Sequence, residues 1–404
     1  MNGNLLNIVS FLGRDWNYVA DRAHHEGLGK YSRLLCVEPP ITIDTPFRKP
    51  KVFWEWLTRR RGLRQFSETL WLYKPVAIVP YYISHRFPFL RGANGVVMKA
   101  SLTKVLERLD MRSNIVVMIS AMQNYVIGML KERLLCYTVS NDLEETFTVS
   151  AEARRRAANE EEEDLKRADI VFTFARSMYE KKRKFNPNTY FSPSAADVDF
   201  FMKSLDPTVQ IPSDLLQTKK PRIGLIGHIG ELHTDIDLFN YLAERHPEWS
   251  IIVVGALQIS RRFRRSPAFM KWQKLPNIHY LGFKRYYEVL PQYLKGLDVC
   301  LLPYKINNYT ASVFPNKLFQ YLAGGKPVVS TDIPEIRPYG DVIAIARDHA
   351  EFEEMVEGAL EEQSLQRIAQ RIAVAKENSV EKRAEVKISL IKSLFNVKVA
   401  GASR

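Results

Sequence analysis

The side chains best suited to chemistry lie in one short segment, Pro315, Asn316, Lys317 and Gln320. Pro315 suits the first turn of a helix, whose free N–H groups and positive dipole end attract an anion such as a diphosphate. Lys317 can add a charge-assisted contact to that anion. Gln320 lies about one turn further along the helix and can reach a sugar hydroxyl from the same face. The alternative interpretation is an ordinary crossover helix that binds nothing.

A glycine-rich turn is the second candidate. Gly224, Gly227 and Gly230 close a predicted strand and precede a helix, and glycine lets a backbone approach a ligand closely. The spacing is not the Gly-x-Gly-x-x-Gly of dinucleotide-binding proteins, and the next strand ends at Gly255 without an acidic residue for a ribose. A nicotinamide-dependent dehydrogenase is therefore disfavoured. A tight strand-to-helix turn without a ligand is the alternative.

The elements that position these residues follow an α/β pattern. Short β-branched runs alternate with helix-length segments along the whole chain, which predicts two Rossmann-like parallel-sheet domains with the ligand at the carboxyl ends of the strands. We expect a strand near 76–80 and a solvated acidic face at 160–163. The expected organisation is a first domain over 1–205, a linker over 206–221, a second domain over 222–380, and a helical tail over 381–404 that packs back on the first domain.

Composition narrows the class of protein. The 404 residues are 46% hydrophobic and 25% charged, which excludes a largely disordered or disulfide-stapled chain. A net charge of +13 favours anionic partners. The three cysteines are scattered in apolar stretches, which favours a reducing, cytoplasmic location. No apolar run reaches the roughly 20 residues that span a bilayer, so any membrane contact is expected to be peripheral.

Two basic segments of the sequence favour binding to an anionic surface. The segment 51–74 combines basic and aromatic residues, which suits docking on an anionic membrane, although a solvated arginine face over core tryptophans explains it equally well. Its expected membrane contacts are Trp54, Trp56, Arg59, Arg60, Arg61 and Arg64. A second segment, 261–274, contains four arginines and two lysines and can meet the same membrane or an anionic glycan. Nothing resembles a nucleic-acid-binding motif, so nucleic acid is not an expected partner.

The segment around Lys317 resembles a known family. Pro315-x-Lys317 and the run Gln-Tyr-Leu-Ala-x-Gly-Lys-Pro-Val-Val over 320–329 are similar to the nucleotide-sugar-binding segment of GT-B fold glycosyltransferases of the large retaining group (group 1, family 4-like). The type most similar is that of bacterial surface-polysaccharide and teichuronic-acid biosynthesis. Weaker matches, including Asp15-Trp16 and the segment 297–303, extend the resemblance over nearly the whole chain.

The sequence departs from this family in two acidic motifs. The paired glutamates of the family, eight residues apart, fall on Ser312 and Gln320, so an amide replaces the carboxylate expected to hold the ribose. The frequent acidic pair after the fifth strand appears as Asn141-Asp142.

The resemblance implies a nucleotide-sugar-dependent, hexosyltransferase-type enzyme that uses no cofactor and no metal. The second domain would hold the donor and the first domain the acceptor. The leaving diphosphate itself would deprotonate the acceptor as the sugar is transferred with retention. The implied catalytic residues are Asp142 and His228, and the acceptor-binding residues are Gly13, Asp15 and Trp16. The implied donor-binding residues are Gly227, Gly230, Phe283, Lys284, Arg285, Ser312, Pro315, Asn316, Lys317 and Gln320.

Three alternatives remain open at this point. Two Asp-x-Asp triplets, 197–199 and 235–237, are compatible with a metal-dependent transferase, but Asp235 is better explained as a helix N-terminal acid. Loss of the two glutamates is compatible with a non-catalytic relative that binds sugar nucleotides or acts as a scaffold subunit. A sugar-nucleotide epimerase of the same fold, which needs no acceptor, is a further possibility.

Overall fold

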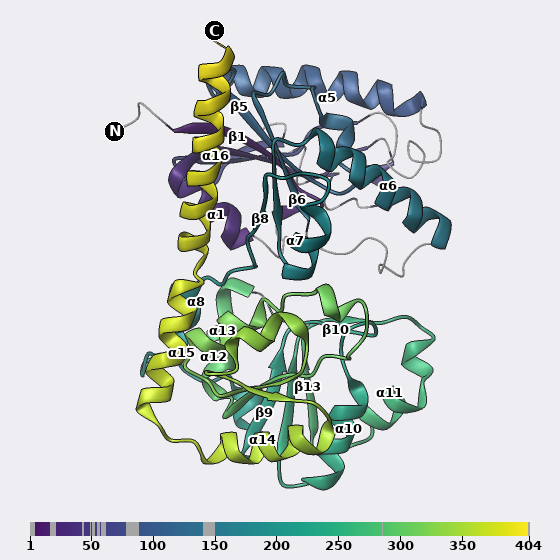
Figure 1. Cartoon of the computed structure of the whole chain (residues 1–404). Coiled ribbons are helices and arrows are strands. Elements are labelled where there is room, and N and C mark those ends of the chain that lie inside the picture. The colour runs from purple at the N-terminus through teal and green to yellow at the C-terminus, as the bar shows by residue number, and fades with distance from the viewer. Residues whose placement is uncertain are drawn as a thin grey trace. The chain divides into compact units, whose positions relative to one another are not determined.

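The structure is a computed structural model that describes residues 5–16, 22–42, 44–48, 50, 53–54, 57, 62–77, 89–139, 150–284 and 286–402 (Figure 1). It divides into two compact units. Unit 1 comprises Met1–Ser192 and Arg383–Arg404, and unit 2 comprises Pro193–Lys382. The boundary thus lies before the segment expected as a linker. That segment contains the short helix α9 (Ser213–Leu216), whose Leu215 is buried in the core of unit 2.

Unit 1 is built on an eight-stranded sheet of order β3-β4-β2-β1-β5-β6-β7-β8. All neighbouring strands are parallel except β3 and β4. The central strands are almost entirely buried, as expected for a parallel sheet covered on both faces. The strands are β1 (Leu6–Phe11), β2 (Ser32–Val37), β3 (Leu63–Gln65), β4 (Leu70–Tyr73), β5 (Ile115–Ser120), β6 (Leu134–Val139), β7 (Ile170–Thr173) and β8 (Thr189–Phe191).

Helices cover the two faces of this sheet (Figure 1). The main ones are α1 (Arg22–Tyr31), α5 (Phe89–Arg108), α6 (Ala151–Arg167), α7 (Arg176–Lys182) and α16 (Val380–Ala402), with the short α2 (Thr45–Arg48) and η3 (Asn124–Val126). The C-terminal helix α16 buries Ala384, Ile388, Ile391 and Phe395 in a core shared with β1, β2 and β7. The prediction that the tail packs on the first domain is confirmed.

Of two local expectations in unit 1, one was wrong and one is only partly tested. A strand, β4, lies six residues before the one expected near 76–80, Val76 forms an isolated bridge with Ile41, and residues 78–80 lie outside the described part of the chain. The acidic run 160–163 is not wholly solvated, because Glu161 is buried and its carboxylate lies 2.6 Å from the ammonium group of the equally buried Lys182. A buried carboxylate needs such a partner, and no helix-face pattern reveals which glutamate has one.

Unit 2 contains a six-stranded, all-parallel sheet of order β13-β11-β9-β14-β15-β16. Because strand order reverses between β9 and β14, the carboxyl ends of these two strands form the topological switch point, where open α/β sheets bind ligands. The strands are β9 (Arg222–Ile226), β11 (Ser250–Val254), β13 (Ile278–Gly282), β14 (Val299–Leu302), β15 (Val328–Thr331) and β16 (Ala344–Ala346). A small parallel pair, β10 (Ile229–Gly230) and β12 (Leu257–Gln258), lies beyond the ends of β9 and β11.

The helices of unit 2 are α8 (Val198–Met202), α9, α10 (Ile236–Arg245), α11 (Pro267–Trp272), α12 (Tyr286–Gly296), α13 (Lys317–Ala323), α14 (His349–Glu361) and α15 (Leu365–Glu377), with short 3-10 turns η4 (Lys203–Leu205), η5 (Phe263–Arg265), η6 (Thr310–Ser312) and η7 (Pro334–Tyr339). Asp197 caps α8 and Asp235 caps α10, each accepting a hydrogen bond from a backbone N–H of its helix. The prediction for Asp235 is confirmed, and Asp197 has the same role.

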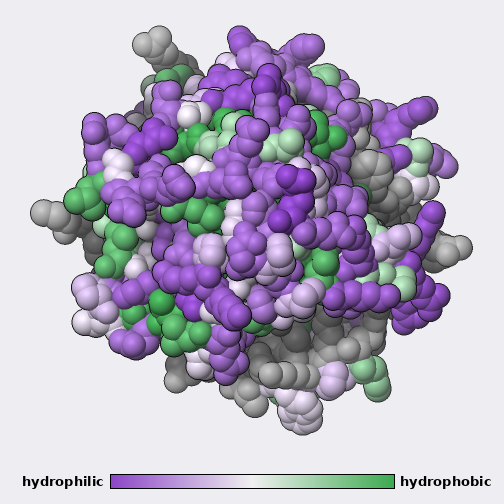
Figure 2. All heavy atoms as spheres, turned by 90° about the horizontal axis from the view of Figure 1, so that it is seen from below, coloured by the Kyte–Doolittle hydropathy of each residue, from purple (hydrophilic) through white to green (hydrophobic). Residues whose placement is uncertain are grey.

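The surface offers little apolar area on the face seen in Figure 2, where hydrophobic side chains form small separate areas among hydrophilic ones. Among the described helices, none is both long enough and apolar enough to cross a bilayer.

Candidate functional site

The candidate site is built where β9 ends. Gly227 follows β9, and its N–H donates to the carbonyl of Val254 at 2.7 Å. A Cβ on Gly255, at the end of β11, would overlap the carbonyl of Gly227, so the two strand ends can approach this closely only with glycine there. Gly224 has a packing role instead, because a Cβ there would overlap the carbonyl of Ile252 on β11.

Lys317 lies over this turn. A Cβ on Gly227 would overlap Cε of Lys317 and lie 2.9 Å from its Nζ, so the lysine side chain passes directly over the glycine. Lys317 is the first residue of α13, and Asn316 is its N-cap without a side-chain capping bond. Pro315 precedes the N-cap rather than occupying the first turn. The expectation that Lys317 and the glycine turn form one site is consistent with this geometry.

Tyr321 holds α13 against the end of β9. Its hydroxyl accepts a hydrogen bond from the N–H of Ile226 at 2.9 Å and donates to the carbonyl of the same residue at 3.1 Å. The tyrosine is buried, as are Leu318, Phe319 and Leu322 on the same helix. Helix α13 is therefore fixed to the strand that delivers Gly227, and Lys317 is positioned by that attachment.

The site carries a positive charge that no described carboxylate neutralises. No carboxylate in the described part of the chain lies within ion-pairing distance of Lys317, and burial lowers the pKa of its ammonium group to about 8. Burial and the nearby Lys317 lower the pKa of His233 to about 4, with smaller contributions from His228 and Lys305. The charged form of each group is thus less favoured than it is in water, and an anion bound beside it would favour it.

His233 is a neighbour of the site that the sequence pattern did not single out. Its ring lies against Gly230, where a Cβ would overlap it, and Nε2 lies 3.4 Å from the carbonyl oxygen of His228. The only signal was a histidine three residues after the last glycine of the turn. The N–H of Gly230 donates to the hydroxyl of Thr234 at 3.1 Å, so in this structure a neighbouring side chain, and not a ligand, satisfies it.

Two aromatic rings lie at the rim of the site. His228 and Phe283 are nearly parallel, at 8°, with ring centroids 6.5 Å apart, and both are exposed. The ammonium group of the adjacent Lys284 lies 3.0 Å from the carboxylate of Asp214. That carboxylate also accepts a hydrogen bond from the hydroxyl of Tyr293. Arg285 lies outside the described residues. Of the two described residues of the predicted loop 283–285, Phe283 is therefore more open to a ligand than Lys284.

The two positions that replace the family's glutamates differ in environment. Ser312 is buried and its hydroxyl donates to the carbonyl of Tyr309 at 3.1 Å. Gln320 is half-buried on α13, one turn beyond Lys317. Gln320 therefore remains the better candidate for a direct contact with a ligand.

Unit 1 gathers a second polar cluster where its strands end. Asp15 follows β1 and forms an ion pair with Lys74, which follows β4. Glu38 follows β2, is buried, and accepts a hydrogen bond from the N–H of Trp16 at 2.7 Å. Trp16 is itself buried, and its indole N–H has no hydrogen-bond partner within the described structure. Gly13 is exposed in the same loop. Glu38 and Lys74 were not predicted as site residues, because the contacts that join them to Trp16 and Asp15 link separate strands and leave no signal in the residue spacing.

The remaining predicted residues are only partly described. Asp142, Trp56, Arg59, Arg60 and Arg61 lie outside the described residues. Trp54 is 62% exposed, as a membrane contact would require. Arg64 lies in β3, with its guanidinium 3.8 Å from the carboxylate of Glu38, and so belongs to the polar cluster of unit 1.

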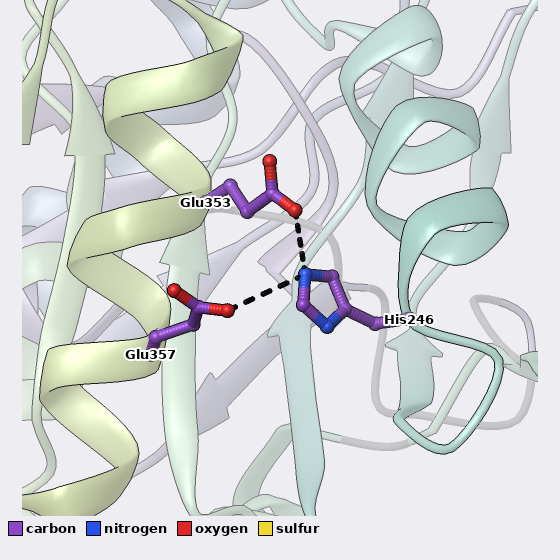
Figure 3. A group of neighbouring side chains, drawn as sticks. All are labelled: His246, Glu353 and Glu357. Carbon is purple, nitrogen blue, oxygen red and sulfur yellow. Dashed lines mark hydrogen bonds and ion pairs between the residues drawn. The ribbon is translucent and has the colours of Figure 1, made fainter.

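A histidine and two glutamates also meet in unit 2. Figure 3 shows Glu353 and Glu357 of α14 pointing toward His246, which ends α10. The three ligand atoms lie within 4.8 Å of one another, a spacing that a metal ion could use. However, the Glu353 carboxylate already accepts hydrogen bonds from Arg245 at 2.6 Å and from Tyr241 at 2.8 Å. The cluster is thus explained as an ion-pair network that joins α10 to α14.

Comparison with known proteins finds similarity within the second unit. A sequence profile of the family described as "Glycosyl transferases group 1" matches residues 220–362. The protein named as teichuronic acid biosynthesis glycosyltransferase TuaH of Bacillus subtilis (strain 168) is 34% identical over 112 residues, 27% of this chain and 27% of that protein. The chain thus matches about a quarter of the length of this relative.

Solved structures share the fold of the whole chain. Sucrose-phosphate synthase from Thermosynechococcus elongatus superposes with a TM-score of 0.69 at 13% identity, over 97% of this chain and 100% of that one. Anabaena Alr3699/HepE in complex with UDP and glucose gives 0.63 at 14% identity, over 96% and 100%. At these identities the likeness establishes the fold, which is the predicted GT-B arrangement of two Rossmann-like domains.

Proposed function

Because residues 220–362 match the sequence profile of the group 1 glycosyl transferases, we propose that the protein transfers a sugar from a nucleoside-diphosphate sugar to a surface-glycan or lipid-linked acceptor. One observation carries the proposal. The half-buried side chain of Lys317 lies over the Gly227 turn at the switch point, and no described carboxylate pairs with its ammonium group. The ammonium group of Lys317 therefore has no described carboxylate to neutralise it. The diphosphate of a sugar nucleotide is an anion that would form a charge-assisted contact with it.

The donor fits the residues around this lysine. Lys317 and the backbone around Asn316 would contact the diphosphate, Gln320 would reach the ribose, and Phe283 would stack on the base. His233 would remain neutral near pH 7 and donate a hydrogen bond without adding a second charge. Support for a nucleotide in this fold comes from the Anabaena Alr3699/HepE structure, which is a complex with UDP and glucose.

The chemistry proposed is sugar transfer with retention and without a metal ion. Negative charge builds on the diphosphate as it leaves, and the ammonium group of Lys317 would stabilise it in a partly desolvated site. His228, at the rim, would assist the leaving group. The leaving diphosphate would accept the proton of the attacking hydroxyl, and Asp142 would orient that hydroxyl.

The acceptor is proposed to bind at the strand ends of unit 1. Asp15, Trp16 and Gly13 were predicted to bind it, and Glu38 and Lys74 contact Trp16 and Asp15, so we include them in the proposed site. The buried indole N–H of Trp16 without a partner supports a site that hydrogen-bonds a polar ligand. We place the protein in the cytoplasm, peripherally at the membrane. All three cysteines are free and buried, which supports a reducing compartment.

A thermal-shift screen against nucleoside diphosphates and their sugar conjugates, with and without a divalent chelator, tests the proposal. A ligand that binds only the native state raises the midpoint of unfolding. We expect one nucleotide family to raise it in the wild type whether or not the chelator is present. Loss of this shift in Lys317→Met, but not in the exposed-surface control Lys219→Met, would assign it to this site. No shift from any nucleotide with folded wild-type protein would refute the proposal.

Product analysis separates the transferase from the non-catalytic relative left open by Ser312 and Gln320. Release of the nucleoside diphosphate from the identified donor, on addition of a glycan or lipid-linked acceptor, would support transfer. Binding without release under any acceptor condition would favour a sugar-nucleotide-binding subunit.

A further inference from the structure

The basic segment 261–274 forms an exposed surface on unit 2 that the proposed transfer reaction does not use. Arg261, Arg262, Arg264 and Arg265 are all exposed, and none of them pairs with a carboxylate in the part of the chain that the structure describes. Lys274 is likewise exposed, whereas Lys271 forms an ion pair with Glu244 at 2.7 Å. We call the four arginines and Lys274 the arginine surface.

The arginine surface lies in a stretch of the sequence that contains basic but no acidic residues. No aspartate or glutamate occurs between Glu248 and Glu288, while the four arginines and two lysines of 261–274 lie within that interval. Acidic residues adjacent in the sequence thus do not neutralise the arginine surface, and Glu231, which the structure brings to this loop, hydrogen-bonds Ser260 and, within the described part of the chain, forms no ion pair with the four arginines. Elsewhere on unit 2 surface arginines are often paired, such as Arg347 with Glu351. A cluster of one sign attracts partners of the opposite sign over about 10 Å at ordinary salt.

The loop that carries the arginines is firmly held. The hydroxyl of Ser260 donates to Glu231 at 2.8 Å and accepts from the N–H of Phe263 at 3.1 Å. The ring of Phe263 packs near Phe269 of α11, and Ser266 caps α11 by accepting from the N–H of Phe269. The arginines therefore lie on an ordered loop. Binding through them costs less conformational entropy than binding through a flexible tail would.

The same region exposes apolar side chains. Met270 of α11 is 46% exposed beside the lysine at 271, and Leu257 and Ile259, just before the arginines, are half-buried. A soluble anionic glycan would use only the charges. A bilayer interface rewards the combination of charges with apolar groups that enter the headgroup region. The composition of the surface therefore favours a membrane.

The surface also lies next to the candidate donor site within unit 2. Residues 257–258 of β12 pair with residues 229–230 of β10, in the turn that contacts His233. The hydrogen bonds from Ser260 to Glu231 continue this connection. Figure 1 shows α11 at the flank of unit 2. A bilayer bound here would lie close to the edge where the donor is proposed to bind.

We propose that the arginine surface of unit 2 docks on an anionic phospholipid membrane. Docking itself does not depend on the proposed transfer reaction. The benefit of docking, access to a lipid-linked acceptor, rests on the proposed function. It adds a contact on unit 2 to the one expected from the segment 51–74 of unit 1.

Co-sedimentation with vesicles tests this proposal. We expect the wild type to bind vesicles containing phosphatidylglycerol and not vesicles of phosphatidylcholine alone, with binding that weakens as salt increases. The quadruple variant Arg261→Gln, Arg262→Gln, Arg264→Gln and Arg265→Gln should bind the anionic vesicles at least about 30-fold more weakly. A matched control, Lys99→Gln, Lys104→Gln, Lys219→Gln and Lys376→Gln, makes the same change in net charge at dispersed exposed positions and should retain most of the binding.

Four outcomes would overturn the proposal. They are absence of wild-type binding to anionic vesicles, equal loss in the two quadruple variants, equal binding to both kinds of vesicle, and binding of a soluble anionic polysaccharide that requires the arginines while vesicles are ignored. The nucleotide thermal shift of each variant is measured in parallel. A wild type that binds vesicles but no nucleotide would refute the proposed function and leave the docking surface standing.

Discussion

The side chain of Lys317 crosses directly over the Cα of Gly227, so that the residue after β9 and the first residue of α13 share one small volume. Neither residue is near the other in sequence. They meet because Tyr321 ties α13 to the backbone of Ile226, one residue before the glycine.

Gly227→Ala tests this relationship. The added Cβ would overlap Cε of Lys317, so either the turn or the lysine must move. We expect a loss of stability of about 1–3 kcal/mol, as for other overpacked sites, and nucleotide affinity reduced at least tenfold by the displaced ammonium group. Chemical denaturation and calorimetric titration measure the two effects. Gly358→Ala, in a helix with open space around the glycine, is the control and should be neutral or slightly stabilising.

The pH dependence of nucleotide binding tests the role of the Lys317 charge. Its pKa is about 8 in the free protein, and a bound diphosphate would raise it. Binding is then coupled to proton uptake above pH 8, so affinity should be constant from about pH 7 to 7.5 and fall by up to tenfold per pH unit above 8. Lys317→Arg, whose charge persists in this range, should bind without that fall. An unchanged pH profile in the arginine variant would contradict this assignment.

Removal of the Tyr321 hydroxyl should loosen α13. In Tyr321→Phe the buried N–H and carbonyl of Ile226 lose their shared partner, which predicts a loss of about 1–3 kcal/mol in the free energy of unfolding. Weaker nucleotide binding should accompany it, because the same attachment positions Lys317. Urea denaturation, followed by a spectroscopic signal from unit 2, measures the loss in the free energy of unfolding. Tyr280→Phe, which loses one exposed hydrogen bond to Gly255, is the control and should change stability little.

Acid should weaken the network at Glu353. Hydrogen bonds from Arg245, Tyr241 and His246 outweigh burial and hold the pKa of this carboxyl below its usual range. The unfolded state therefore binds the proton more readily, so the stabilisation is present above about pH 4.5 and is lost as pH falls through the lowered folded-state pKa. Glu353→Gln should cost about 1–2 kcal/mol at pH 7, and the difference from wild type should shrink in acid.

Denaturation at several pH values gives this difference directly. Glu351→Gln, which disrupts the exposed pair with Arg347, should have little effect on stability at pH 7. A difference between wild type and Glu353→Gln that stays constant from pH 7 to acid would show that the charge of Glu353 is not what holds α10 to α14.

Much of the fold was predictable because both sheets are largely parallel, with only β3 and β4 antiparallel among the paired strands described. Continuous apolar runs such as 251–254 indicate buried strands, and the proline, lysine and glycine signals around α13 marked its helix. The boundary at Ser192 was not predictable, since proline-rich composition over 207–221 looked like a linker although Leu215 is buried in the core. Composition indicates how exposed a segment is expected to be, but it does not reveal that one of its side chains packs into a core.

The site was predicted in part for a similar reason. Gly227 and Lys317 carried local signals, a strand-end glycine and a helix-start cation. His233, Tyr321 and Glu38 act through contacts with residues outside their own elements, and no spacing rule reveals such contacts. The role of Glu161 was misjudged because its partner, Lys182, lies on another helix.

Calorimetric titration of UDP and other nucleoside diphosphates into the wild type, Lys317→Met and Lys219→Met is the sharpest test of the proposed donor site. We expect one diphosphate to bind the wild type and the Lys219 variant alike, and to bind Lys317→Met at least tenfold more weakly because a charge-assisted contact is lost. Equal affinity in the folded Lys317→Met protein would show that the diphosphate does not bind over the Gly227 turn.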